Sequence, residues 1–313
     1  MKKFVAILLT LMLVLGVSAA FAANGEPTFT KNLKVVNEGT TAPETTFTFK
    51  YEFVSVDDGN GNALVGVTGP ALDDSTVTLG GTTPLTGTVA IPDAVYPVVG
   101  VYHYNVIEQD TNVAGIENHS GKMSLKVSYY YDGEAKEYKK AYAFYANGTE
   151  KSDIVTNNYS AGKLNINKTV TGNLGDKTKY FEFKVTLTGE ASKIYGASYE
   201  VTGGSNTSNP STIKIGEETT FLLKDGETIS IANLPYGVTY SVTETAADGY
   251  TTTTEGKTTD SINAAETTVT FTNTKNGTID TGVTTESLPY VVLMGFVVLA
   301  GAALLLKRKA HNN

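Results

Sequence analysis

The chain has 313 residues, a formal net charge of −8 and no cysteine. An acidic surface argues against nucleic acid or an anionic membrane as a partner, and without cysteine no disulfide bond can stabilise the fold. The sequence contains neither a metal-ligand spacing nor a nucleophile-elbow motif, so we expect no metal, no cofactor and no ordinary enzyme activity.

The first 22 residues have the pattern of a secretory signal peptide. Lys2 and Lys3 precede an apolar run, and Ala20-Phe21-Ala22 then places small residues at the two positions that a signal peptidase recognises. The alternative is an N-terminal membrane anchor, but the apolar run is short for a bilayer span. We therefore expect residues 1–22 to be removed and the rest of the chain to be exported.

Short runs of alternating apolar and polar residues follow, rich in Thr, Val, Tyr and Phe and separated by Gly, Asn and Asp. This pattern predicts an all-β fold of two tandem immunoglobulin-like antiparallel β-sandwich domains. We expect the first domain to span residues 23–160 and the second 161–275, with a linker short enough to hold them end to end. The segment 57–62 superficially resembles a calcium loop, but it lacks the spaced acidic ligands, so a hairpin turn is expected.

Two sets of three polar residues occupy positions where the alternation calls for apolar ones. Each set contains a Lys, a Glu and an Asn in that order: Lys31, Glu108 and Asn157, then Lys168, Glu244 and Asn273. Because successive side chains of a strand point to opposite faces, each polar residue shares a face with its apolar neighbours. The sequence therefore predicts two buried groups of an amine, an acid and a carboxamide.

Such a group could form an amide bond between Lys and Asn. Burial lowers the pKa of a Lys by up to roughly 3–5 units, which yields the neutral amine that can attack a carboxamide. A protonated Glu could polarise the Asn carbonyl and move protons as ammonia leaves, while fixed geometry makes the step intramolecular. The alternative is an ordinary Lys–Glu pair with an Asn nearby, but the repetition of the whole set favours a self-formed cross-link.

The C-terminal segment, residues 276–313, has the pattern of a membrane-held tail. An uncharged apolar run spans residues 290–306 and is followed at once by Lys307, Arg308 and Lys309. This order predicts a transmembrane segment whose basic end stays in the cytoplasm.

Taken together, these features resemble the streptococcal-type backbone pilins of Gram-positive bacteria. The similarity rests on FTKNL and TFTFK within residues 28–50, GVYHYNVIEQ at 100–109, FLLKDGETISIANLPYGVTYSVTE at 221–244, and VTFTN at 269–273. It implies two intramolecular isopeptide bonds, Lys31–Asn157 and Lys168–Asn273, with Glu108 and Glu244 as their catalytic acids. Val155 stands where the resemblance leads us to expect Phe.

The resemblance also implies covalent assembly by sortases, which cleave between Thr and Gly and join the Thr to a Lys of another subunit. The candidate motif ends in Thr281-Gly282 and lacks the usual Leu and Pro; a plain membrane anchor is the alternative. Lys151, six residues before Asn157, is the implied acceptor, and the other candidates are Lys136, Lys139 and Lys140.

Two functions fit this sequence, and both place the mature protein at the cell wall. The first is the structural shaft subunit of a surface pilus, whose partners are further copies of itself, the pilus and housekeeping sortases, minor pilins and peptidoglycan. The second is a monomeric wall-anchored adhesin or minor pilin with a host ligand. A secreted enzyme has little support in the sequence.

Overall fold

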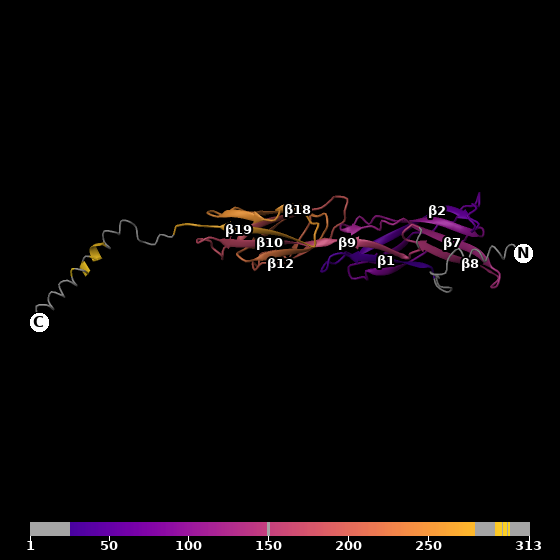
Figure 1. Cartoon of the computed structure of the whole chain (residues 1–313), viewed down its shortest axis with the longest axis horizontal. Coiled ribbons are helices and arrows are strands. Elements are labelled where there is room, and N and C mark those ends of the chain that lie inside the picture. Colours follow the sequence, from indigo (N-terminus) through magenta and orange to yellow (C-terminus); the bar gives the residue numbers. More distant parts are fainter. Residues whose placement is uncertain (1–25, 149–150, 279–291, 296, 299, 301–313) are drawn as a thin grey trace.

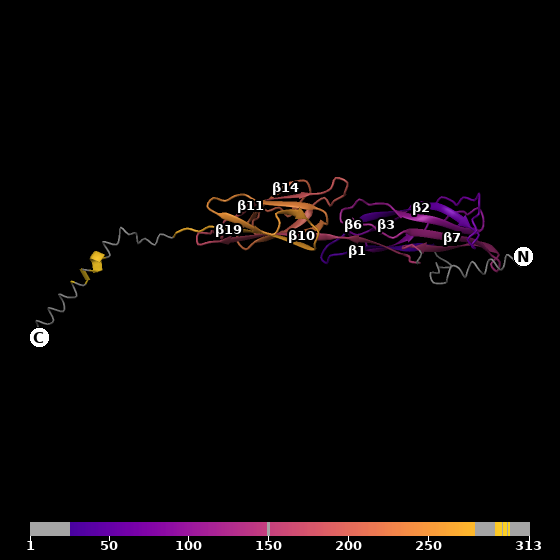
Figure 2. The same ribbon diagram turned by 45° about the horizontal axis from the view of Figure 1, so that its top comes forward.

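The computed structural model describes residues 26–148 and 151–278, together with helical residues 292–295, 297, 298 and 300. Nineteen strands in these described ranges form two β-sandwiches that lie end to end in a long rod (Figures 1 and 2). The predicted signal peptide, the Thr281-Gly282 motif and most of the predicted membrane span lie outside the described residues. Among the residues that are described, none belongs to a helix long and apolar enough to cross a bilayer.

The first sandwich contains two sheets with the strand orders β4-β1-β9-β6 and β3-β2-β5-β7-β8. Its strands are β1 (Thr28–Val35), β2 (Thr45–Asp57), β3 (Ser75–Leu79), β4 (Thr86–Ala90), β5 (Gly100–Glu108), β6 (Ile116–Glu117), β7 (Met123–Asp132), β8 (Glu137–Tyr145) and β9 (Ile154–Tyr159). The alternation recognised in the sequence is visible in β2, where Phe47 and Phe49 are fully buried between exposed or half-buried neighbours.

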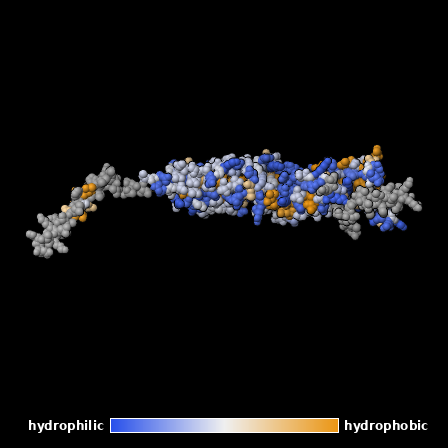
Figure 3. Space-filling model, viewed as in Figure 1, coloured by the Kyte–Doolittle hydropathy of each residue, from blue (hydrophilic) through white to orange (hydrophobic). Residues whose placement is uncertain are grey.

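The second sandwich contains two sheets with the orders β13-β12-β15-β10-β19-β17 and β14-β11-β16-β18. Its strands are β10 (Ala161–Thr171), β11 (Phe181–Thr188), β12 (Tyr199–Gly203), β13 (Thr212–Ile213), β14 (Glu218–Leu223), β15 (Thr228–Pro235), β16 (Thr239–Glu244), β17 (Thr251–Glu255), β18 (Thr259–Ser261) and β19 (Glu266–Thr274). Each sandwich has its own hydrophobic core, and the visible face of the rod is mostly hydrophilic (Figure 3).

The strands of both sandwiches pair mostly in the expected antiparallel direction, with one parallel strand pair in each sandwich. The first and last strands pair in parallel: β1 with β9, and β10 with β19. In the first pair Lys31 lies opposite Val155, and in the second Lys168 lies opposite Phe271. In both pairs the Asn of the predicted triad therefore lies two residues beyond the partner of the Lys. Alternation of side chains is the same in parallel and antiparallel strands, so the sequence pattern could not distinguish them.

The two sandwiches are joined by a continuous strand path and by side-chain contacts. Strand β9 passes into β10 through the single residue Ser160. Asn37 donates hydrogen bonds to the carbonyl of Ala161 and to the hydroxyl of Tyr236, at 2.8 and 2.7 Å. The Asn233 side chain pairs with both backbone groups of Thr41, accepting from its N–H and donating to its carbonyl at 2.9 Å each. These contacts fix one sandwich against the other.

Candidate functional sites: two buried Lys, Glu and Asn triads

The first triad is assembled from both sheets of the first sandwich. Lys31 on β1 and Asn157 on β9 come from neighbouring strands of one sheet, and Glu108 ends β5 in the facing sheet. Lys31 and Asn157 are fully buried, and the Glu108 side chain is 3% exposed. The structure thus brings together three residues that are distant in the sequence, because alternation turns each of them toward the core.

Within the first triad every polar group faces another. The Lys31 ammonium nitrogen lies 3.0 and 3.2 Å from the two carboxylate oxygens of Glu108 and 2.5 Å from Oδ1 of Asn157. The Asn157 amide nitrogen donates to Oε1 of Glu108 at 2.6 Å. The Glu108 carboxylate therefore contacts the nitrogens of Lys31 and Asn157, and it does not bind the carbonyl oxygen of Asn157. This differs from the expectation that the Glu polarises the carbonyl.

Aromatic side chains surround the amine of the first triad. The Lys31 nitrogen lies 4.7 Å from the ring centre of Phe47 and 5.8 Å from that of Phe49. Burial in this environment lowers the pKa of Lys31 to about 8, against the opposing effect of the Glu108 charge. Burial therefore favours the neutral, nucleophilic form of the amine.

The second triad repeats the contacts of the Glu with both nitrogens, but within the described ranges it has no counterpart of the hydrogen bond from Lys31 to the Asn carbonyl oxygen. Lys168 on β10 lies 3.1 and 3.3 Å from the carboxylate oxygens of Glu244 on β16, and Asn273 on β19 donates to Oε1 of Glu244 at 2.5 Å. Lys168 packs 4.3 Å from the ring centre of Phe181. Burial lowers the pKa of Lys168, and the negative charge of Glu244 opposes this shift.

The two triads differ in what surrounds the carboxamide. In the first, the backbone N–H of His119 donates to Oδ1 of Asn157 at 2.8 Å, and the Asn157 amide nitrogen donates to Oδ1 of Asn118 at 3.3 Å. In the second, Oδ1 of Asn273 is buried and has no partner among the described residues. Sequence reasoning missed Asn118 and His119 because they lie in a loop without alternation, and a backbone N–H has no residue-type signature.

This arrangement suits a single chemical step, attack of the Lys amine on the Asn carboxamide. In the first triad the Lys31 amine is held beside the carbonyl oxygen of Asn157, and in both triads the reaction would be intramolecular. The Glu carboxylate contacts both the attacking and the leaving nitrogen, which is where a proton must be taken and delivered. The product would be a neutral amide, which removes the free-energy penalty of a buried charge.

The residues predicted for assembly are placed only in part. Lys151 is exposed and lies just before β9, next to Ser152, which pairs with Tyr145 at the end of β8. Of the other acceptor candidates, Lys139 bonds the carboxylate of Asp132 at 2.8 Å and Lys140 that of Asp93 at 2.5 Å. Thr281 and Gly282 lie outside the described residues.

Comparison with known proteins identifies the class, bacterial pilus proteins. A family described as a domain of unknown function (DUF7601) matches residues 162–275. Over 309 residues the chain is 31% identical to a pilin of Streptococcus pyogenes serotype M1, covering 90% of each chain. The chain therefore belongs to this pilin family.

Two further relatives refine the comparison. The crystal structure of the major pilin from Streptococcus pyogenes matches with a TM-score of 0.56 and 26% identity, covering 82% of this chain and all of the pilin chain. The pilus tip adhesin Cpa of Streptococcus pyogenes is 35% identical over 130 residues, which are 40% of this chain and 18% of the adhesin. The likeness to the pilins thus extends along both sandwiches, and that to the adhesin covers a part only.

Proposed function

We propose that this pilin is the shaft subunit of a surface pilus, polymerised head to tail by sortase and reinforced by two self-formed isopeptide bonds. The observation that carries the proposal is the end-to-end match to pilins, 90% of each chain for the sequence relative and the whole length of the major pilin structure. The tip adhesin, by contrast, has only 18% of its length in common with this chain. This contrast favours the shaft over the adhesin.

The cross-links are supported by the geometry of the triads. Each amine is buried beside aromatic rings, each Glu bridges the amine and the carboxamide nitrogen, and the register of the parallel pair is the same in both sandwiches. Intact-mass measurement of the exported chain tests this, because each bond removes one ammonia. Glu108→Ala and Glu244→Ala should each abolish one loss and leave the other, and retention of both losses in either variant would contradict the role of that Glu.

Head-to-tail polymerisation is supported by the positions of the two ends. The proposed acceptor Lys151 precedes β9, which runs toward the second sandwich, whereas the chain leaves the second sandwich after β19 at the far end of the rod (Figure 1). Asn173 fixes this exit by donating to the carbonyl of Gly277 at 2.7 Å and accepting from its N–H at 3.0 Å. An amide between Thr281 and Lys151 would therefore join subunits along the rod axis.

Wall extracts on a denaturing gel test the polymer. Wild-type protein should give a high-mass ladder, and Lys151→Ala should give a folded, wall-attached monomer, because wall anchoring to peptidoglycan needs only the donor Thr281. Lys139→Ala is the matched control and should leave the ladder intact. A normal ladder from Lys151→Ala would move the acceptor elsewhere. A single band from the wild type would favour the wall-anchored adhesin or minor pilin.

A further inference from the structure

We propose that the loop of Asn118 and His119 is a catalytic part of the first triad. In this assignment the backbone N–H of His119 stabilises the oxyanion that develops on Asn157, and the Asn118 side chain holds the amide nitrogen that leaves. The inference rests on the proposed Lys31–Asn157 bond and adds two groups to its chemistry.

Strand pairing places this loop beside the reacting carboxamide. The short strand β6 pairs with β9 so that Ile116 lies opposite Tyr159 and Glu117 opposite Asn158. The two residues that follow β6 therefore reach Asn157, where the His119 N–H binds Oδ1 at 2.8 Å and Asn118 accepts from the amide nitrogen at 3.3 Å. Together with Glu108, these contacts fix both ends of the carboxamide before any reaction.

The loop is held in this position by its own contacts. Nε2 of His119 donates to the carbonyl of Ala146 at 2.8 Å, and the carbonyl of Lys122 accepts from the N–H of Gly148 at 2.9 Å. A side chain on Gly121 would overlap His119 Nε2 and the Ala146 carbonyl, so glycine is required for this close approach. A donor fixed in advance stabilises developing charge without a reorganisation cost at the moment of reaction.

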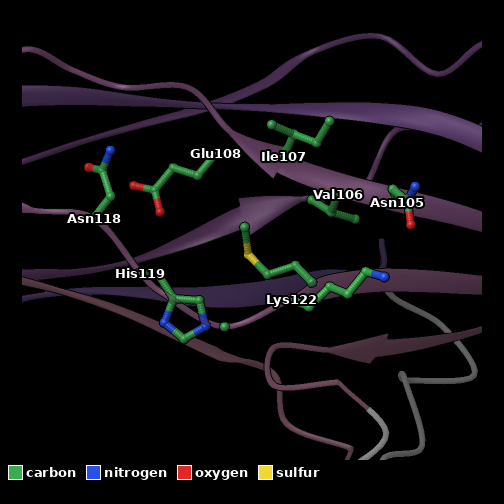
Figure 4. Close-up of a pocket in the computed structure, with 9 residues that line it drawn as sticks. Asn105, Val106, Ile107, Glu108, Asn118, His119 and Lys122 are labelled. Atoms are coloured by element: carbon green, nitrogen blue, oxygen red, sulfur yellow. The ribbon is translucent and has the colours of Figure 1, made fainter.

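The proposed step forms one amide bond and releases one molecule of ammonia. Neutral Nζ of Lys31 attacks Cγ of Asn157, and the carbonyl electrons move to Oδ1, where the His119 N–H already donates. Glu108 accepts a proton from Nζ and delivers it to Nδ2, both of which it contacts. The Cγ–Nδ2 bond then breaks, ammonia leaves, and the Nζ–Cγ amide remains. A surface pocket lined by Glu108, Asn118, His119 and Lys122 adjoins the site and offers the ammonia a way out (Figure 4).

The second triad provides a comparison within the same molecule. Oδ1 of Asn273 has no hydrogen-bond partner among the described residues, whereas Oδ1 of Asn157 has the His119 donor. Loss of a single oxyanion donor slows acyl-transfer reactions by about 10²–10³-fold. Once both sandwiches have folded, the first bond should therefore form at a higher rate than the second.

Timed cell-free synthesis of the full-length chain tests this difference in rate and the role of the loop. Proteolysis and mass spectrometry at each time point measure both cross-linked peptides separately. His119→Pro removes the N–H and should slow the first bond by about 10²-fold, whereas His119→Ala keeps the N–H and should slow it far less. Asn118→Ala should slow it by about fivefold, the effect of one weak hydrogen bond. In all three variants the second bond is the internal control and should form at the wild-type rate.

The pH profile separates catalysis from loosening of the fold. Loss of a hydrogen-bond donor lowers the plateau rate of bond formation but does not change the pH at which half of that rate is reached. A loosened site admits water to Lys31 and raises that midpoint pH. Equal first-bond rates in wild type, His119→Pro and Asn118→Ala would overturn the inference, as would a shifted midpoint in Asn118→Ala. If His119→Pro does not fold, Asn118→Ala and the relative rates of the two bonds in the wild type decide. Absence of both cross-linked peptides from wild-type protein would instead refute the proposed cross-linking itself.

Discussion

Pulling on the rod should distinguish the two proposed cross-links, because only one of them would lie on the path of tension. Force applied between residue 151 and residue 278 passes along β9 into β10 and reaches Lys168. With the Lys168–Asn273 bond present, the force crosses directly to β19 and leaves at the end of the chain. Residues between Lys168 and Asn273 are then bypassed, and the segments that bear load are already extended strands.

Lys168→Met removes this bypass and keeps an apolar side chain of similar length. Unfolding of the second sandwich would then release roughly 100 residues at about 3.5 Å each, an extension on the order of 350 Å. Lys31→Met is the matched control, since it removes the same chemistry from the first sandwich. It should release no such extension, because Lys31 precedes residue 151 and is not on the path.

Single-molecule force spectroscopy can make this measurement cleanly. The chain has no cysteine, so Lys151→Cys and Thr278→Cys provide the only two attachment points for handles. Wild-type protein should show no extension step at forces that unfold sandwiches without cross-links. A step on the order of 350 Å in the wild type, or the same step in Lys31→Met, would refute the reasoning.

Three other predictions concern stability, pH and the joint between the sandwiches. The Lys168–Asn273 bond closes a loop of roughly 100 residues, so Lys168→Met should lower the free energy of unfolding by about 5 kcal/mol and the melting temperature by about 20 °C. Lys163→Met changes an exposed Lys on the same strand, in a surface pair with Glu266, and should alter stability by less than about 0.5 kcal/mol; equal melting curves for the two variants would contradict the structural role of the bond. Formation of the first bond should speed up about tenfold per pH unit up to a pH of about 8 and then level off, because only the neutral amine of Lys31 reacts; a rate in timed mass measurements that falls with rising pH would exclude amine attack. Asn233→Gly keeps the left-handed backbone conformation at that position, where φ is 58°, but removes the two hydrogen bonds between the Asn233 side chain and Thr41. It should broaden the interdomain angles seen by small-angle scattering without changing the melting of either sandwich, and an unchanged scattering profile would show that other contacts hold the joint.

The buried triads could be predicted from the sequence because each member is a polar residue at a strand position where the alternation calls for an apolar one. Lys31 and Asn157 stand in phase with apolar residues, and no surface role explains two such sets in the same order. The all-β fold followed from the same alternation. Membership in the pilin family was likewise recognisable from the segments around the two Glu residues.

Other parts of the site depend on interactions that leave no residue pattern. The first strand of the sandwich, β1, pairs in parallel with the last, β9. The sequence pattern does not indicate this direction, because side chains alternate in the same way in parallel and antiparallel strands. The His119 contribution is a backbone N–H, so any residue except proline could supply it. Asn233 adopts a positive φ, which Asn tolerates better than most residues, and its side chain contacts the neighbouring sandwich.

The path of tension would give the two proposed cross-links different physical tasks. The second would lie on the path and prevent the second sandwich from lengthening. The first cross-link would not have this role, because residues 26–148 are attached to the loaded strand β9 but do not themselves lie on the path of tension. What tension can do there is draw β9 out of its sheet, between β1 and β6. An amide from Lys31 to Asn157 would join β1 covalently to the middle of β9. Strand β9 could then not be pulled out of its sheet without β1. The first proposed bond would therefore keep the first sandwich attached to the strand that bears the load, and the second proposed bond would carry the load across the second sandwich.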